Sequence, residues 1–255
     1  MSVLGISAVI ATAVLVGTVL QRISGSGVGL VVAPVLTIII GPGLGVLITN
    51  MTTMVSGFLI MLAVLPRIDW RRYRRVGLPA VLGAVPGAWL VGQLSAGWLA
   101  IILAGLVLCA LALTIGLPKL PQWTGRTSGI IAGTLGGFFN TTSGVAAPVM
   151  VVYSRVSAWG PSSFAATMQP IFLTMGAASV VTKLAMGSVD TDGHVPVDLW
   201  VLFPLVVVTV LVGIGAGGLL AKVVTPTGAR RLAMTLATLG AVGALIRGVL
   251  EVAGG

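Results

Sequence analysis

The stretch LWVLFPLVVVTVLVGIGAGGLLAKV, residues 199–223, carries no charged side chain before Lys222. A helix needs about 20 apolar residues to cross a hydrocarbon core of roughly 30 Å. The same pattern fills the chain, since its mean hydropathy is +1.14 and 7% of its 255 residues are charged. A water-soluble domain needs a charged surface, and this composition excludes one. We therefore predict an all-α polytopic membrane protein.

The apolar stretches predict about eight to ten membrane segments in one membrane domain, residues 1–255. The first stretch has neither a basic residue ahead of it nor a convincing cleavage site, so we expect a retained helix rather than a signal peptide. The predicted segments are Val3–Leu20, Val28–Ile40, Leu44–Leu65, Val76–Leu94, Trp98–Leu117, Gly129–Phe139, Val145–Val156, Phe164–Met186, Leu199–Val223 and Leu232–Val252.

The few charges predict the orientation of these segments. Five arginines crowd residues 67–75, opposed by Asp69 alone, and short basic loops of this kind face the cytoplasm. The net charge of +9 is therefore explained by membrane topology, and we expect no nucleic-acid partner. The loop at 190–198 has acidic residues and no Lys or Arg, which places it outside. We predict a multi-pass protein of the cell inner (plasma) membrane. The other basic residues expected on the cytoplasmic side are Lys119, Arg126, Lys222, Arg230 and Arg231.

The two charged loops occupy similar places in the two halves of the chain, yet they are predicted to lie on opposite sides. This indicates two inverted-topology repeats, residues 1–117 and 127–255. Each repeat would hold a broken or re-entrant helix pair and three transmembrane helices, with both termini outside. The alternative is eight plain crossings with parallel halves.

Polar residues interrupt the first helix pair of each half, at Gln21–Gly27 and at Asn140–Gly144. Irregular backbone at membrane depth must be buried in protein or line a wet cavity. The helix that follows such a break offers free N–H groups and the positive end of its dipole, which bind anions. We therefore predict a central anion site between the two breaks. Its candidate substrate-binding residues are Ser24, Ser26, Asn140, Thr141, Thr142 and Ser143.

Further polar residues extend this site. Asn50 and Gln169 lie in the segments after the breaks, where an amide side chain is not easily hidden. Arg22 is either a charge partner for the anion or an ordinary interfacial arginine. Lys183 lies late in its segment and is expected to snorkel outward.

The middle of each apolar segment lacks a carboxylate and a histidine. Proton relays and cation sites need such groups, and so does hydrolysis by a His or Asp mechanism. Cys109 is the single cysteine, and no phosphate-binding Gly-Lys-Ser/Thr motif is present. We expect no enzyme activity, no metal and no cofactor.

The chain resembles the sulfite exporter TauE/SafE family over nearly its whole length. The resemblance rests on Ser24–Gly29 leading to Ala33-Pro34, on its partner Ser143–Pro148, and on the arginine-rich loop. Family members usually have a glycine-rich run before such a Val/Ala-Pro pair in both halves, whereas this chain has Asn140-Thr141-Thr142 in the second. The resemblance implies export of sulfite or a small organosulfur anion such as a sulfonate.

From these observations we predict a transporter that exports a small organosulfur oxyanion, with the membrane potential as its driving force. One alternative is an importer of the same anion class, and another is a membrane scaffold or assembly protein without a substrate. The expected partners are the small anion, sulfite or sulfonate, and the lipid bilayer. A homodimer is one arrangement that the sequence leaves open.

Overall fold

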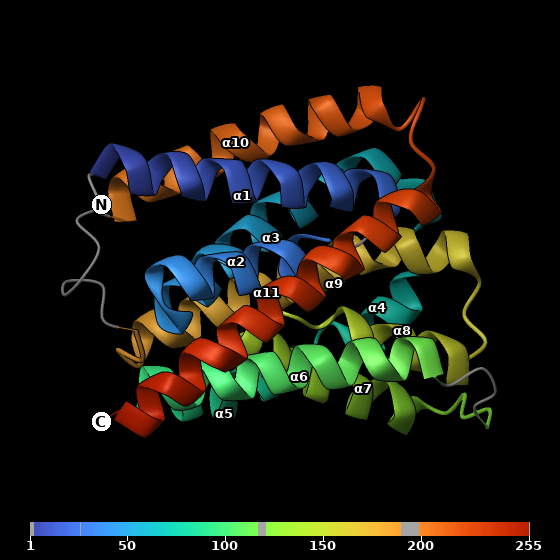
Figure 1. The fold of residues 1–255 in the computed structure, drawn as a ribbon. Helices are drawn as coiled ribbons and strands as arrows, with labels where there is room; N and C mark the ends of the chain where they lie inside the picture. The colour runs from blue at the N-terminus through green and yellow to red at the C-terminus, as the bar shows by residue number, and fades with distance from the viewer. Residues whose placement is uncertain (1–2, 26, 117–120, 190–198, 255) are drawn as a thin grey trace.

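Helices form the whole of the described structure. The computed structural model describes residues 3–25, 27–116, 121–189 and 199–254 (Figure 1). The first half contains α1 (Val3–Ser24), α2 (Val28–Ile40), α3 (Pro42–Val64), a short 3₁₀ turn (Leu65–Arg67), α4 (Trp70–Val76), α5 (Ala80–Gln93) and α6 (Ala96–Gly116). The second half contains α7 (Arg126–Ser143), α8 (Ala147–Val156), α9 (Pro161–Ala185), α10 (Leu199–Leu220) and α11 (Pro226–Gly254).

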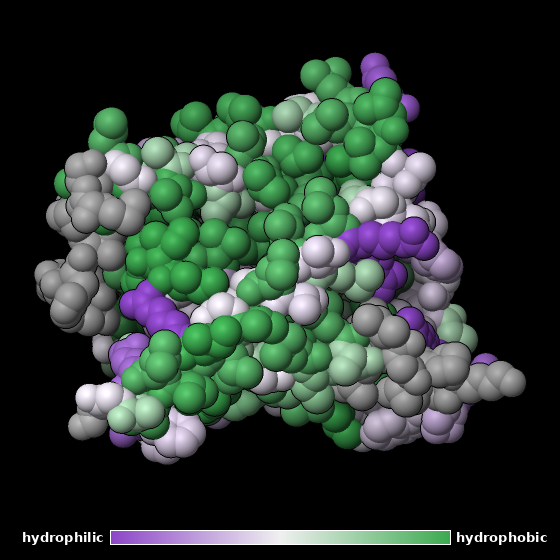
Figure 2. Space-filling model, in the orientation of Figure 1, coloured by the Kyte–Doolittle hydropathy of each residue, from purple (hydrophilic) through white to green (hydrophobic). Residues whose placement is uncertain are grey.

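The helices are long and apolar enough to cross a membrane. Within the described residues, six helical spans of 21 to 29 residues meet that requirement. Large apolar side chains on their outer faces are exposed, such as Leu82, Val208 and Leu239, which are 60 to 66% accessible. Figure 2 shows apolar atoms across the middle of the visible face and hydrophilic atoms toward its two ends. The prediction of an all-α polytopic membrane protein is confirmed.

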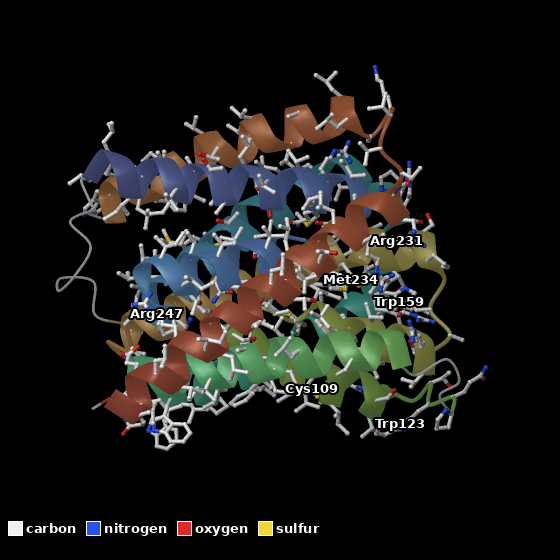
Figure 3. The ribbon with its side chains drawn as sticks, viewed as in Figure 1. Cys109, Trp123, Trp159, Arg231, Met234 and Arg247 are labelled. Carbon is white, nitrogen blue, oxygen red and sulfur yellow. The ribbon has the colours of Figure 1, made fainter. Side chains whose placement is uncertain are left out.

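The helices run back and forth between the two ends of the bundle, and charged residues lie at both ends. Both chain termini lie at the same end, and α4 lies at the other (Figure 1). Figure 3 places Arg231 at the end of the bundle with α4, whereas Arg247 lies at the end that holds the termini. Arg247 donates a hydrogen bond to the Ile38 carbonyl, where a cation stabilises the C-terminal end of α2.

Glycines of α5 and α10 allow neighbouring helices to pack closely against them. In α5, a Cβ on Gly83 would lie 1.8 Å from the Thr134 carbonyl oxygen of α7, and a Cβ on Gly213 of α10 would lie 3.4 Å from the Leu15 carbonyl oxygen of α1. Leu15 and Thr134 are 119 positions apart. Each of these glycines begins a Gly-x-x-x-Gly motif, Gly83–Gly87 in α5 and Gly213–Gly217 in α10, and both motifs let a neighbouring backbone approach.

The same spacing recurs where α3 crosses α9. A Cβ on Gly57 would lie 2.9 Å from the Gln169 carbonyl oxygen, and a Cβ on Gly176 would lie 2.7 Å from the Asn50 carbonyl oxygen. Gly57 and Gly176 are 119 positions apart, as are Asn50 and Gln169. The two glycines at the crossing of α3 and α9, and the two residues whose carbonyls they approach, are therefore separated by one common spacing.

The helices that precede the breaks are longer than the sequence indicated. The predicted segment Gly129–Phe139 is part of α7, whose 18 residues span about 27 Å. Polar residues extend it because Ser143 donates to the Phe139 carbonyl, as Ser24 donates to the Leu20 carbonyl at the end of α1. The helices end at Gly25 and Gly144, whose φ angles of 80° and 73° favour glycine.

Candidate functional site

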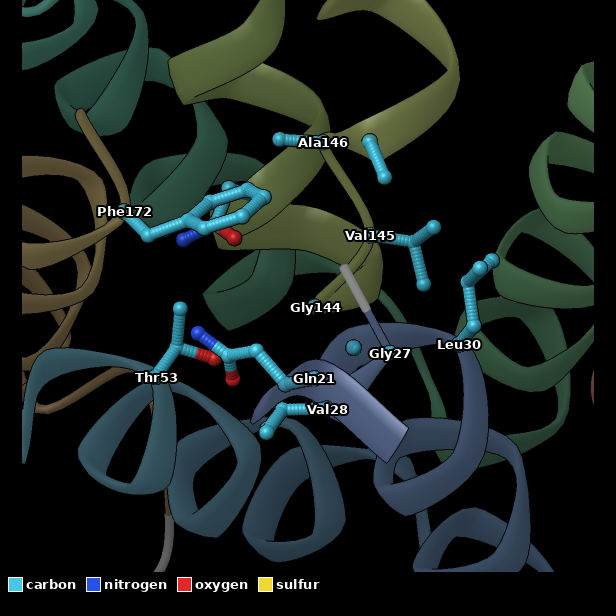
Figure 4. Close-up of a pocket in the computed structure, with 12 residues that line it drawn as sticks. Gln21, Gly27, Val28, Leu30, Thr53, Gly144, Val145, Ala146 and Phe172 are labelled. Carbon is cyan, nitrogen blue, oxygen red and sulfur yellow. The ribbon is translucent and has the colours of Figure 1, made fainter. Parts of the chain in front are cut away.

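The two turns that break the helix pairs face each other inside the bundle. A Cβ on Gly29, in the first turn of α2, would lie 2.2 Å from the carbonyl oxygen of Gly144, in the turn before α8. A larger residue at position 29 would push the two turns apart, so glycine is required there. A small cavity lies at this junction, lined by the first turns of α2 and α8 together with side chains of α1, α3, α7 and α9 (Figure 4).

The lining of the cavity contains no charged side chain. The first amides of a helix have no carbonyl partner within that helix, and the lining includes residues of the first turn of α2 and Ala147 at the start of α8. In the turn before α8, the Val145 N–H donates to the Ser143 hydroxyl at 3.3 Å, and Pro148 in the first turn of α8 has no N–H. Two helix N-termini therefore converge on one cavity, where their dipoles add.

Buried amide side chains surround the cavity in two linked pairs. Gln21 donates to the Gln169 side-chain oxygen at 3.2 Å and accepts from Ser56 at 3.0 Å. Asn140 donates to the Asn50 side-chain oxygen at 2.9 Å, and Asn50 donates to the Ser179 hydroxyl at 2.5 Å. All four amides are at most 2% exposed. Buried polar groups of this kind are stable because each has a partner.

Three of the hydroxyls predicted to bind the anion donate within their own helices. Ser24 donates to the Leu20 carbonyl at 2.8 Å, Ser143 to the Phe139 carbonyl at 2.7 Å, and Thr142 to the Phe138 carbonyl at 2.9 Å. A hydroxyl has one proton to donate. An anion would have to turn these hydroxyls away from their helices before it could use them.

Two other predicted residues point away from the cavity. Thr141 is buried against Gly87 of α5, and Arg22 packs its Cβ 2.8 Å from a Cβ placed on Gly217 of α10. Arg22 and Thr141 are again 119 positions apart, and each contacts a glycine of a neighbouring helix. The contact with α10 favours the interfacial interpretation of Arg22. Ser26 lies outside the described residues.

Lys183 does not snorkel, so that expectation was wrong. Its side chain is fully buried near the end of α9, and its Nζ has no hydrogen-bond partner among the described residues. Ser179 lies one turn earlier and accepts from Asn50. The α3–α9 contact, which Gly176 permits, encloses this part of α9, so the lysine stem has no short path to the membrane surface.

Gln21, Thr53 and Phe172 line the cavity but were not among the predicted site residues. Figure 4 shows Gln21 and Thr53 beside each other, across the cavity from Gly144 and Val145. Gln21 and Asn140 are separated by the same 119 positions as Asn50 and Gln169, and so are Thr53 and Phe172. An internal alignment on that spacing would have found Gln21.

The family is decided by comparison over nearly the whole chain. The family model described as Sulfite exporter TauE/SafE matches residues 9–244 of 255. The chain belongs to the TauE/SafE family. No curated protein and no solved structure matches it. The recognition made from the two Gly-and-Pro runs is confirmed, and it identifies the fold as one used by membrane transporters.

In this TauE/SafE protein the central cavity is closed. Its volume is about 10 Å³, which leaves room for about one water molecule. A second, larger cavity of about 180 Å³ lies next to it and shares Ala147 and Phe172 with its lining. Ser24, Gly25 and Arg230 also line this second cavity, which we call the vestibule.

Among the residues that line the vestibule, Arg230 is the one with a cationic side chain. Arg230 lies in the first turns of α11, beside Arg231 at the bundle end that holds α4. The positive-inside rule predicts this end to be cytoplasmic. The TauE/SafE chain thus has an arginine-lined chamber on the predicted cytoplasmic side and a closed, uncharged chamber at its centre.

Proposed function

We propose that this protein exports a small oxyanion of sulfur, of the sulfite or sulfonate type, from the cytoplasm. One observation carries the proposal: the N-termini of α2 and α8 converge on a buried cavity whose lining has no charged side chain. Oriented amides and dipoles stabilise an anion, while a cation finds no carboxylate there. The family membership points to the same class of substrate.

The proposed route begins in the vestibule. Arg230 would gather the anion from the cytoplasm, and the anion would then pass between Ala147 and Phe172 into the central cavity. Phe172 lines both chambers, so rotation of its ring would open or close the passage between them. Because the central cavity holds about one water molecule, binding requires the two turns to separate.

We further propose that the two halves are inverted repeats that exchange roles during transport. The recurrent 119-residue spacing of contacts supports this assignment, with repeats at 1–117 and 127–255. The Gly25 turn opens onto the vestibule, whereas a Cβ on the equivalent Gly144 would lie 3.0 Å from Ala33 and 3.1 Å from Thr49. Outward release would open the Gly144 turn and close the Gly25 turn, as expected for alternating access.

A stability screen tests the proposed substrate. The detergent-purified protein is heated with millimolar sulfite, thiosulfate, short sulfonates, sulfate or matched carboxylates. A ligand that binds the folded state alone raises the melting temperature. At a ligand concentration 100 times Kd, it adds about 2.7 kcal/mol to the free energy of unfolding. We expect a selective rise with a sulfur oxyanion, and a loss of that rise in Asn140→Ala. Equal melting with every anion, combined with no efflux from proteoliposomes, would support a scaffold instead.

The vestibule leads to a second prediction, on Arg230. We expect Arg230→Gln to raise the cytoplasmic-side KM for export about tenfold and to leave the maximal rate within about twofold, because Arg230 concentrates the anion without forming the central site. Arg231→Gln is the matched control, since its exposed side chain does not line the vestibule. The measurement is initial efflux from oriented proteoliposomes. The route would be rejected if both variants had the same KM.

A further inference from the structure

A second basic cavity lies on the outside of the bundle. It shares no lining residue with the central cavity or the vestibule. Four arginines line it, Arg71, Arg74, Arg75 and Arg126, and its volume is about 610 Å³. The apolar part of its lining includes Leu82 and Ile130, which are 66% and 37% exposed. We call this cavity the arginine pocket.

Close backbone packing brings the four arginines together. A Cβ on Gly133 of α7 would lie 2.1 Å from the Val76 carbonyl oxygen, and one on Gly129 would lie 3.2 Å from the Arg75 Cβ. These glycines let the start of α7 pack directly on α4. Arg126, in the first turn of α7, is thereby placed beside the arginines of α4. This packing brings four positive charges close together, so they repel one another. An anionic ligand would relieve that repulsion.

Arg72, on the same short helix, is held by the protein itself. Its backbone N–H donates to the Asp69 carboxylate at 3.0 Å, and its guanidinium lies 3.5 Å from that carboxylate. The guanidinium also donates to Ser157 and lies 4.9 Å from the ring centroid of Trp159. The Arg72–Asp69 pair is the single ion pair in the described part of the chain. The four arginines of the pocket have no carboxylate partner there.

We propose that the arginine pocket binds an anionic phospholipid of the cytoplasmic leaflet. Guanidinium groups bind phosphate oxygens in a bidentate manner, and several of them can hold one headgroup. Leu82 is exposed on a span that is long and apolar enough to cross a membrane, Trp70–Gln93, and Ile130 is exposed on the neighbouring α7, so an acyl chain can lie against both side chains. A free phosphate would use the arginines and leave the apolar lining uncovered. This proposal does not depend on the transport function.

The test compares lipids and variants in the full-length protein. The delipidated protein is titrated with phosphatidylglycerol, with phosphatidylcholine, or with glycerol phosphate, which lacks acyl chains. Retained lipid and the melting temperature are both measured. The variant R71Q/R74Q/R126Q removes three charges from the pocket. The control R67Q/K222Q/R231Q removes three charges from the same end of the bundle at positions that do not line it.

We expect phosphatidylglycerol to stabilise the wild type and the control equally, and phosphatidylcholine to have little effect. Each basic residue near an anionic lipid surface contributes about a fivefold factor, so the pocket variant is expected to bind at least tenfold more weakly. Three results would overturn the proposal: equal affinity in the pocket variant and the control, equal stabilisation by the two phospholipids, or a full effect of glycerol phosphate alone. A pocket variant that fails to fold is replaced by the single variants R74Q and R126Q, to which the same criteria apply.

Discussion

Replacing Gln21 by glutamate is expected to lower anion export about a thousandfold. Gln21 lines the central cavity, and its side chain already accepts a hydrogen bond from Ser56. A carboxylate at that position can keep this bond and accept another if the Gln169 amide rotates, so the fold is expected to survive. A charge about 4 Å from the bound anion costs about 4 kcal/mol at an effective dielectric constant of ~20. The α2 and α8 dipoles would also stabilise the carboxylate in place of the substrate.

The matched control is Gln93→Glu, the same chemical change at an exposed position at the end of α5. It is expected to leave export unchanged. Efflux of labelled anion from proteoliposomes gives the rate, and the melting temperature and helical circular dichroism check folding. Near-normal export by well-folded Gln21→Glu would show that the anion passes elsewhere. Asn140→Asp extends the test, because the proposed repeats make Asn140 the equivalent of Gln21 and predict a similar loss.

The sequence was sufficient for the class of fold and for the location of the two breaks. Hydropathy identifies lipid-facing helices because each must be apolar over its whole length. Glycine next to a polar residue marked where the helices end, and Gly25 and Gly144 do end them. Asn140, Asn50 and Gln169 were predicted to belong to one anion site; the structure pairs Asn140 with Asn50 and Gln169 with Gln21, and their binding of an anion stays a prediction.

What the sequence could not supply was the direction in which each polar side chain points. Ser24 and Ser143 lie at the breaks, yet their hydroxyls donate to their own helices. Arg22 is next to Gln21 in sequence, but one step along a helix turns a side chain by about 100°, so Arg22 faces α10 while Gln21 faces the cavity. Lys183 was misplaced because burial depends on α3, a distant segment. Neither the direction of a side chain nor its burial by a distant segment can be read from composition.

Net export is expected to follow the membrane potential. The central network consists of neutral amides and hydroxyls, so a monovalent anion would cross the membrane with its charge uncompensated. Moving one charge through 100 mV changes the free energy by about 2.3 kcal/mol, which is about a fiftyfold change in the equilibrium gradient. In proteoliposomes with a potassium gradient and valinomycin, a potential negative on the cytoplasmic side should drive export, and reversing it should drive uptake. An importer coupled to another ion would not reverse in this way.

Lys183 provides the decisive control for this prediction. It is the one Lys, Arg, Asp, Glu or His side chain that is buried in the described part of the chain, so it is the first candidate for the proton carrier of a proton-coupled mechanism. We expect Lys183→Met to retain voltage-driven export, and we expect collapse of the pH gradient to leave the wild-type rate unchanged. If the pH gradient alone drives export, and Lys183→Met abolishes it while still folding, then a proton accompanies the anion and the potential-driven mechanism is excluded. Voltage-driven export that persists in Lys183→Met instead assigns the whole driving force to the charge of the anion.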